Sequence, residues 1–148
     1  MEQLMGLNTH KYEVLITEKH LDTFGHVNNA VYLELYEEAR WDLITSGGWG
    51  MDRIQRDKIG PVITSLKIDF KRELKNRETV VIETVFGGFR NSKISFLEQK
   101  MIKSDGQVAN TMTMEAGLFD LKQRRLVDPS DEWMAALGVK GDWRVYLK

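Results

Sequence analysis

The clearest pattern along the chain is a helical repeat of apolar residues between about Asn29 and Ser46. Five apolar residues fall at positions i, i+3, i+4, i+7 and i+11, so they form one stripe along a helix: Tyr32, Leu35, Tyr36, Ala39 and Leu43. Acidic side chains occupy the opposite face. Asn28 or Asn29 is suited to cap the start, and Gly47-Gly48 is suited to end the helix. We predict one long helix with a single buried face.

A period of two, which is typical of strands, replaces the helical period over most of the remaining chain. Residues 62–71 alternate apolar and polar side chains as a half-buried strand does, and residues 78–86 are rich in the β-branched residues that favour strands. We expect strands over 11–17, 62–71, 78–86, 93–103 and from Val108 to about Leu121.

Glycine and proline mark the connections between these elements. Gly87-Gly88 predicts a turn, and Asp105-Gly106 predicts a type I′ hairpin. Asp128-Pro129 supplies an N-cap followed by proline at the first helical position, which predicts a short helix that runs to Leu137. We expect the charge-rich residues from Met51 to Gly60 to form a loop.

The order of these elements is a strand, a long helix, several long antiparallel strands and a short helix. This order is typical of the α+β class. Because a single long helix must cover one face of the sheet, we expect the sheet to curl around it. The other face or an edge of the sheet then stays uncovered, which predicts a homodimer or a larger homo-oligomer.

Composition narrows the class of protein. The chain has 148 residues, which suits a single domain over residues 1–148. It has no cysteine, which excludes disulfides, thiolate metal sites and cysteine nucleophiles. Its 21 Lys and Arg nearly balance its 22 Asp and Glu, so we expect no nucleic-acid partner. No apolar run approaches the ~20 residues that span a bilayer, and we expect a cytoplasmic protein with no membrane partner.

Several kinds of catalytic site are excluded by their missing motifs. The chain has no G-x-S-x-G nucleophile elbow, no G-x-x-x-x-G-K-[ST] phosphate loop and no G-x-G-x-x-G after a strand. Its three histidines, His10, His20 and His26, lack the spacing of zinc ligands. We therefore expect no metal site.

The remaining candidate chemistry lies in residues 22–29, just before the long helix. Asp22 stands seven residues before Asn29, where the first turn of the helix leaves backbone N–H groups without partners. Those groups could hold the oxygen of a polarised carbonyl, while Asp22 attacks its carbon or activates a water. Gly25 would let the backbone turn tightly and approach a ligand. The alternative is structural: Asp22 caps a turn, the asparagines cap the helix and His26 packs.

The segment from His20 to Asp42 closely resembles the start of hotdog-fold acyl-CoA thioesterases of the hydroxybenzoyl-CoA thioesterase superfamily. The best match is the bacterial long-chain acyl-CoA thioesterase group, which shows D-x-x-x-H-V-N-N-x-x-Y and then a helix ending in E-E-A-R-W-D. The matching residues are Asp22, His26, Val27, Asn28, Asn29, Tyr32 and Glu37 to Asp42. The resemblance implies a hotdog fold, in which a curved antiparallel sheet wraps one central helix, and an enzyme of fatty acid metabolism that hydrolyses acyl-CoA without a cofactor.

The resemblance also implies roles for single residues. Asp22 takes the position of the family's catalytic aspartate, which acts as nucleophile or general base. The backbone N–H of Asn29 corresponds to the oxyanion donor, and Tyr32 resembles a residue that lines the acyl site. In this family the active site forms at a dimer interface, so residues 62–66 of a partner subunit are expected to face Asp22.

A CoA substrate carries phosphates, so basic side chains are expected near it. In relatives the segment that matches residues 88–93 lies near CoA, which makes Arg90 and Lys93 candidates. Two further groups are candidates as well: Lys67, Lys71 and Arg72, and Lys122, Arg124 and Arg125. For each of them the alternative is a solvated strand face. Plant-type acyl-carrier-protein thioesterases have an asparagine where this chain has Phe24, which argues against a carrier-protein substrate and leaves CoA open.

Two other classes of function remain open at this stage. A hotdog dehydratase or hydratase would pair an acid with a histidine, and Asp22 and His26 could be such a pair. A non-catalytic hotdog protein would bind acyl-CoA without turnover. The sequence leaves open the acyl chain length, aromatic against aliphatic preference, dimer against tetramer, and a covalent anhydride against general-base attack by water.

Overall fold

The computed structural model describes residues 6–147, so residues 1–5 and Lys148 of the expected domain lie outside the described residues. In chain order its elements are β1 (His10–Leu15), the 3-10 helix η1 (Glu18–His20), α1 (Asn29–Ser46), α2 (Met51–Asp57), β2 (Ile59–Phe70), β3 (Thr79–Phe89), β4 (Ile94–Ile102), β5 (Val108–Asp120), β6 (Arg125–Val127), α3 (Asp131–Ala136) and the 3-10 helix η2 (Trp143–Leu147). The strands form one antiparallel sheet in the order β1-β3-β4-β5-β2, and β6 pairs with β5.

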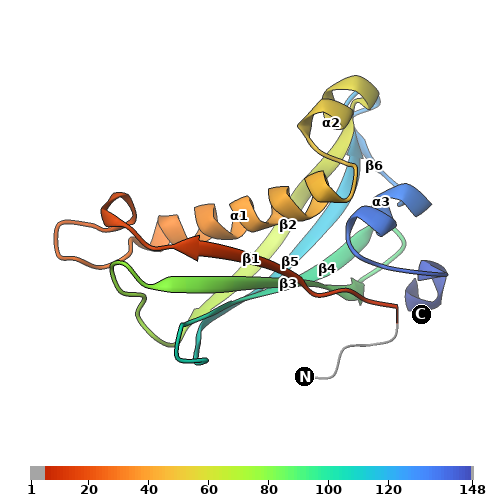
Figure 1. Ribbon diagram of the computed structural model, residues 1–148. Helices are drawn as coiled ribbons and strands as arrows, with labels where there is room; N and C mark the ends of the chain where they lie inside the picture. Colours follow the sequence, from red (N-terminus) through yellow and green to blue (C-terminus); the bar gives the residue numbers. More distant parts are fainter. Residues whose placement is uncertain (1–5, 148) are drawn as a thin grey trace.

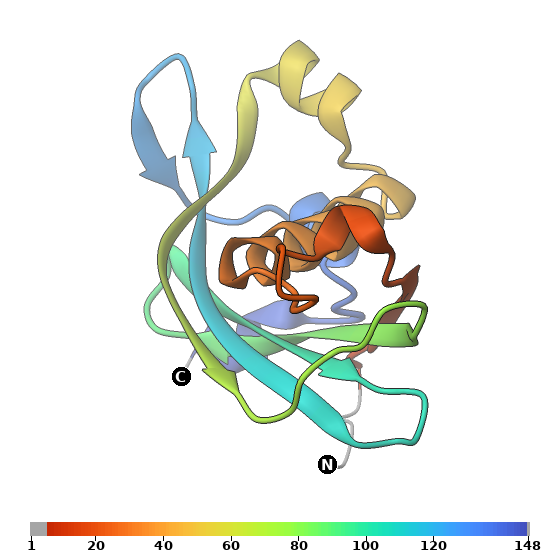
Figure 2. The same ribbon diagram turned by 90° about the vertical axis from the view of Figure 1, so that its left-hand side faces the viewer.

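The sheet curves around α1, which lies along its concave face (Figures 1 and 2). All five residues of the predicted apolar stripe are buried: Tyr32, Leu35, Tyr36, Ala39 and Leu43. The helix begins and ends where the sequence predicted, because Asn28 caps its start and Gly47 its end. The predicted class, an α+β fold with a curved antiparallel sheet around one long helix, is confirmed.

Buried polar side chains fix α1 to the sheet. The Tyr36 hydroxyl donates to Oδ1 of Asn110, a fully buried residue of β5. Gln99 of β4 donates to the Tyr36 carbonyl at 3.2 Å and to the Thr84 hydroxyl at 2.9 Å. Its Oε1 accepts a hydrogen bond of 2.9 Å from Arg40. Because each group has a partner, this buried polar layer positions the helix without a large desolvation cost.

Replacing Tyr36 with phenylalanine is expected to lower the free energy of unfolding by about 1–3 kcal/mol, because Oδ1 of Asn110 then stays buried without its donor. Urea unfolding followed by circular dichroism measures the change. The matched control is Tyr12→Phe, since the Tyr12 hydroxyl donates to Glu38, an exposed residue, at 3.3 Å. Equal effects of the two substitutions would contradict a structural role for the buried bond.

The chain does not turn at Gly87-Gly88, and the predicted turn there is wrong. β3 continues through both glycines and forms a bulge, with a shift in register between Phe86 and Phe89. A Cβ on Gly87 would meet Glu98 Cγ at 3.0 Å, and Gly88 has a φ of +99°. Glycine is therefore needed for close packing and for a left-handed residue inside a strand, which the sequence pattern does not distinguish from a turn.

The Asp105-Gly106 hairpin is confirmed, but its predicted type is wrong. A type I′ turn needs positive φ at both residues, and only Gly106 has it, at +86°. The Gly106 N–H donates to the Lys103 carbonyl at 2.9 Å, and Asp105 Oδ1 accepts from the Gln107 N–H at 3.0 Å. The aspartate therefore stabilises the turn through its side chain rather than through a left-handed backbone.

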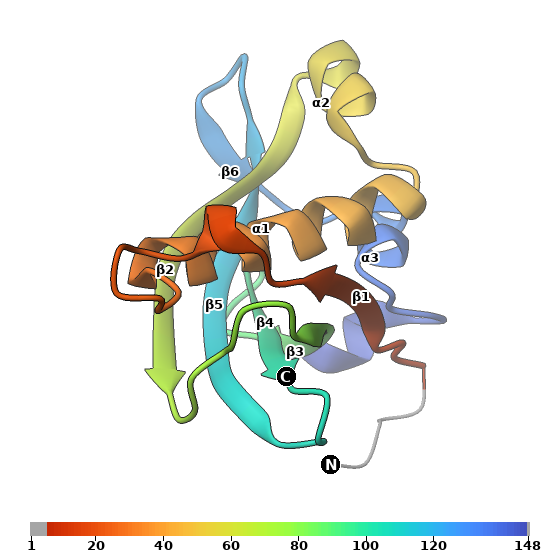
Figure 3. The ribbon, with the colours of Figure 1, turned by 60° about the vertical axis from the view of Figure 1, so that its left-hand side comes forward.

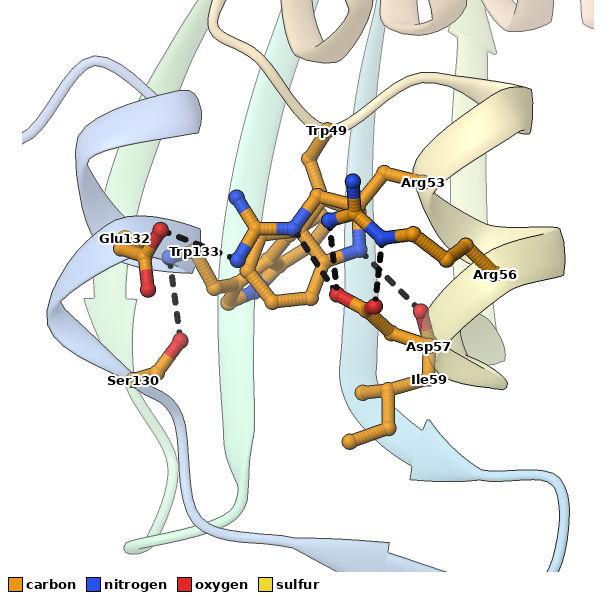
Figure 4. Close-up of polar contacts among 8 residues, drawn as sticks. All are labelled: Trp49, Arg53, Arg56, Asp57, Ile59, Ser130, Glu132 and Trp133. Carbon is orange, nitrogen blue, oxygen red and sulfur yellow. Dashed lines mark hydrogen bonds and ion pairs between the residues drawn. The ribbon is translucent and has the colours of Figure 1, made fainter.

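The expected loop from Met51 to Gly60 instead contains α2, so this prediction is wrong. None of the α2 residues is fully buried; Ile54 packs partly against the core, and Arg53 makes the polar contacts that hold the helix in place (Figure 4). Arg53 stacks 3.9 Å from the ring centroid of Trp49 and pairs with Asp57 at 3.2 Å and with Glu132 of α3 at 3.0 Å. The contact with Glu132 is long-range and the contacts of Arg53 are polar or cation–π contacts, so no apolar period predicts the helix.

The predicted short helix near the C-terminus is confirmed as α3, but it begins later than predicted. Ser130 is its N-cap and accepts a 3.1 Å hydrogen bond from the Trp133 N–H. Asp128, the predicted cap, instead pairs with Lys93 at 2.6 Å. Serine is as good an N-cap as aspartate, and the ion pair with Lys93 holds the Asp128 carboxylate away from the start of α3.

β2 lies at one edge of the sheet, and β1 lies at the other (Figure 3). The half-buried alternation predicted for 62–71 is wrong, because residues 63–67 are all exposed and the register shifts between Ile63 and Ser65. Large apolar side chains along this edge stay in solvent: Ile63 is 46% exposed, Leu66 40% and Phe70 53%. An edge strand of this length and composition is unusual in a monomer.

Candidate functional site

The candidate residues lie on a loop that connects η1 to α1. An antiparallel bridge between Leu21 and Val27 closes the base of this loop, and Val27 is buried beneath it. Arg77 and Asn76, just before β3, hydrogen-bond Glu18 and lower the pKa of its carboxyl to about 2. The loop is therefore anchored at its base, while residues 22–26 protrude into solvent.

Asp22 uses one carboxylate oxygen to shape this loop. Its Oδ1 accepts hydrogen bonds from the backbone N–H of Phe24 at 2.9 Å and of His26 at 3.1 Å. Its Oδ2 has no hydrogen-bond partner among residues 6–147, and the residue is exposed. Gly25 has a φ of +81°, which explains why glycine stands at this turn. The capping role and a chemical role are thus compatible, because each needs a different oxygen.

The two asparagines at the start of α1 have different roles. Asn28 is the cap: its Oδ1 accepts from the Ala30 N–H at 2.9 Å, and its carbonyl accepts from the Val31 N–H at 2.9 Å. Asn29 is the first helical residue, and in the part of the chain that the structure describes its backbone N–H has no acceptor. This N–H is a free donor at the positive end of an 18-residue helix.

An aromatic pair lines one side of the loop. The Tyr32 ring meets Phe70, the last residue of β2, edge to face with centroids 5.0 Å apart. Burial raises the pKa of Tyr32, so its hydroxyl stays neutral. The His26 ring points toward Glu73, with Nε2 to Oε1 at 3.2 Å. These side chains border a surface depression, which is lined by His26, Val27, Tyr32, Phe70, Lys71, Arg72 and Glu73.

The structure brings together five of the predicted site residues and separates the other two from them. Asp22, Gly25, His26, Asn29 and Tyr32 all lie at the loop and the first turn of α1.

Arg90 and Lys93 follow the far end of β3, whose near end adjoins the loop anchor Arg77. With 11 residues, β3 separates these ends by about 35 Å. Arg90 also pairs with Glu115 at 2.6 Å, and Lys93 with Asp128 at 2.6 Å. Within one chain, both residues therefore lie far from Asp22.

An apolar cavity between α1, the sheet and α3 was not anticipated from the sequence. It has a volume of about 120 Å³. Trp41 and Ile44 of α1, Ile63 of β2 and Met114 of β5 are among its lining residues, and Glu37 and Arg40 are the charged ones. Trp41 and Ile44 lie beside the apolar stripe of α1, and this widening of the stripe is the one signal in the sequence that could have indicated the cavity.

Within residues 6–147 there is no cluster of three or more His, Cys, Asp or Glu side chains suited to hold a metal ion. None of the helices formed by these residues is both long and apolar enough to cross a membrane.

The sequence and the fold were compared with known proteins. A family model described as the Thioesterase-like superfamily matches residues 16–137. The chain is 27% identical, over 137 residues, to the long-chain acyl-CoA thioesterase FadM of Escherichia coli, covering 92% of this chain and 95% of that protein. These matches confirm the resemblance that begins at His20.

Solved structures share the fold. The probable thioesterase YbaW of Escherichia coli superposes with a TM-score of 0.75 and 28% identity, over 88% of this chain and 99% of that one. The protein SAV2348 of Staphylococcus aureus, solved in complex with CoA, superposes with a TM-score of 0.81 and 14% identity, over 91% of this chain and 85% of that one. These likenesses confirm the predicted hotdog fold.

Proposed function

Because this chain belongs to the thioesterase-like superfamily, we propose that it is an enzyme that hydrolyses an acyl-CoA thioester to a carboxylic acid and CoA. One observation carries the proposal: within residues 6–147, a carboxylate oxygen of Asp22 and the N–H of Asn29 both lack a partner, and both occur at one junction of loop and helix. A thioester carbonyl needs both a hydrogen-bond donor for its oxygen and a group that attacks its carbon.

The proposed mechanism uses these two groups in turn. The carbonyl oxygen accepts a hydrogen bond from the Asn29 N–H, and the helix dipole stabilises the negative charge that develops on it. Oδ2 of Asp22 then attacks the carbon or removes a proton from an attacking water, and the C–S bond breaks to release CoA as its thiolate. In the first route an acyl–aspartyl anhydride forms and is hydrolysed by water. In the second route water adds directly.

A second copy of the chain is expected to complete the site. The loop is open to solvent on one side, and the edge of β2 beside it carries exposed Ile63, Leu66 and Phe70. Pairing of two such edges would satisfy their backbone groups and cover this apolar surface. In that dimer residues 62–66 of the partner subunit would face Asp22 and exclude water from the thioester.

The 120 Å³ cavity is suited to hold the far end of the acyl group. Its lining on α1 begins at Glu37, eight residues after Asn29, which corresponds to about 12 Å along the helix axis. An apolar cavity of similar size, about 150 Å³, holds a benzene molecule in another protein. We therefore expect a preference for acyl groups long enough to extend from the helix start to the cavity.

The hydratase alternative needs the imidazole of His26 near Asp22. Here Asp22 contacts only the His26 backbone, and Nε2 of the ring lies 3.2 Å from Glu73. This arrangement favours thioester hydrolysis over hydration of an enoyl thioester.

The test measures hydrolysis by the wild type of short, medium, long and aromatic acyl thioesters of CoA, and of acyl thioesters of acyl-carrier protein. Release of thiol is the readout. We expect thiol release from acyl-CoA, with Asp22→Ala inactive as the control. Enoyl-CoA hydration is measured in parallel. Hydration without thiol release, or acyl-CoA binding without turnover, would refute the proposal.

A further inference from the structure

A cluster of positive charge lies around the turn between β5 and β6. We call it the basic turn, and it consists of Lys58, Lys122, Arg124 and Arg125. The Leu121 N–H donates to the Lys58 carbonyl at 2.8 Å, which joins Lys58 to the turn. All four side chains are exposed, and none has an ion pair with a carboxylate among the described residues. In a chain of net charge -1, such a concentration of unpaired cations favours an anionic ligand.

The backbone of the basic turn is firmly built. The single carboxylate inside it, Asp120, accepts the backbone N–H of Lys122 at 2.8 Å and of Gln123 at 2.9 Å. Lys58 has a φ of 59° and Arg124 a φ of 58°, both in the left-handed region. Glycine or asparagine would adopt this conformation at lower cost, so the turn itself does not require cations at these two positions.

Within one chain the basic turn lies far from the candidate site. It adjoins Ile59 at one end of β2, whereas the site adjoins Phe70 at the other end (Figure 1). β2 has 12 residues and spans about 40 Å. A substrate with its thioester at Asp22 therefore cannot reach the basic turn of the same chain.

A second copy of the chain removes this separation. One edge of β2 pairs with β5, and no strand of the described residues pairs with the other edge. In a two-fold dimer this edge would meet its own copy in antiparallel orientation. The Ile59 end of one chain then lies beside the Phe70 end of the other. In that dimer the basic turn of the partner subunit would approach the carboxylates of Asp22 and Glu73, an arrangement of complementary charge.

We infer that the basic turn of each subunit binds the phosphates of the CoA whose thioester lies at Asp22 of the other subunit; this inference rests on the proposed function. CoA carries its phosphates at the end of a long pantetheine arm, away from the thioester, so a second basic site remote from Asp22 is what such a substrate needs. Arginine binds phosphate oxygens through two parallel hydrogen bonds. Arg124 packs over the Phe119 ring at 5.3 Å, and Arg125 donates its Nε to Gln123 at 2.7 Å. Among the described residues, these contacts leave the terminal guanidinium nitrogens of both side chains for phosphate.

The first test compares a thioester substrate that carries phosphates with one that does not. The variant Lys122→Ala/Arg124→Asn removes two charges, and asparagine tolerates the left-handed backbone. We expect its kcat/KM for acyl-CoA to fall about ten-fold at unchanged kcat. Hydrolysis of the matching acyl-N-acetylcysteamine thioester, which has no phosphate, is expected to stay the same. The matched control, Lys11→Ala/Lys140→Ala, removes two exposed cations elsewhere and should leave both rates unchanged.

The second test asks which subunit supplies the charge. An Asp22→Asn chain and a Lys122→Ala/Arg124→Asn chain are co-expressed with different tags, and the mixed dimer is purified. One of its two sites then combines an intact Asp22 with an intact basic turn from the other chain. We expect about half of the wild-type kcat/KM, against about one-twentieth if each basic turn served its own subunit.

The outcomes distinguish the two proposals. If the wild type hydrolyses neither acyl-CoA nor acyl-N-acetylcysteamine, the proposed function fails. If it hydrolyses both, the inference is overturned by unchanged kcat/KM in the basic-turn variant, by equal losses on both substrates, by one-twentieth activity in the mixed dimer, or by an active monomer in sedimentation. A phosphate-specific loss that the mixed dimer restores supports it.

Discussion

Replacing Asp22 with asparagine is expected to lower kcat for acyl-CoA hydrolysis by about 10²–10⁴-fold. Asparagine keeps an Oδ1 that can accept the backbone N–H groups of Phe24 and His26, so the loop should keep its shape. It replaces Oδ2, the oxygen without a hydrogen-bond partner among residues 6–147, by an amide nitrogen that neither attacks a carbonyl nor takes a proton from water. Steady-state kinetics and thermal unfolding of the same samples measure the two effects separately.

Two control variants test this interpretation of Asp22. Asp22→Ala removes both oxygens, so it should lose as much activity as Asp22→Asn and also some stability. Asp105 has the same kind of local role in a remote turn, where its Oδ1 accepts the Gln107 N–H at 3.0 Å. Asp105→Asn should therefore keep full activity. Near-wild-type turnover by a folded Asp22→Asn enzyme would exclude both proposed routes.

The fold was predictable where local pattern and tertiary packing agree. The apolar stripe of α1 is buried along its whole length, because an amphipathic helix has only one way to cover a sheet. The predictions failed where long-range contacts decide. Gly87-Gly88 reads as a turn, but Glu98 and Phe96 of the neighbouring strand require a glycine bulge there. α2 has only a narrow apolar contact with the core, through Ile54, and Arg53 ties it to Trp49 and Glu132.

The same distinction applies to the candidate site: residues close in sequence were predictable, and residues distant in sequence were not. Asp22, Gly25 and Asn29 are local in sequence, so their proximity follows from the loop and the helix start. The phosphate-binding residues are not local, and positive charge alone does not rank them. Arg90 is a weaker candidate in this fold because Glu115 already neutralises it, whereas Arg124 has no carboxylate partner among residues 6–147. Only the topology reveals that the basic turn and the site lie at opposite ends of β2.

Replacing Asn29 with proline is expected to lower kcat by about 10²–10³-fold, because proline removes the N–H that is proposed to bind the carbonyl oxygen. The helix should tolerate this change. Proline is favoured at the first helical position, and Asn28, with φ -65° and ψ 142°, already has the extended backbone that a residue before proline adopts. The Asn28 side chain still caps the Ala30 N–H, so the start of α1 keeps its other hydrogen bonds.

The control for this prediction is Asn29→Ala, which removes the side chain and keeps the backbone N–H. If the N–H is the group that matters, the alanine variant retains most of the wild-type kcat and the proline variant does not. The comparison is direct because the two variants share the loss of the amide side chain and differ in the donor itself. Equal activities of the two folded proteins would show that the carbonyl oxygen is held elsewhere, and the oxyanion role of the start of α1 would have to be abandoned.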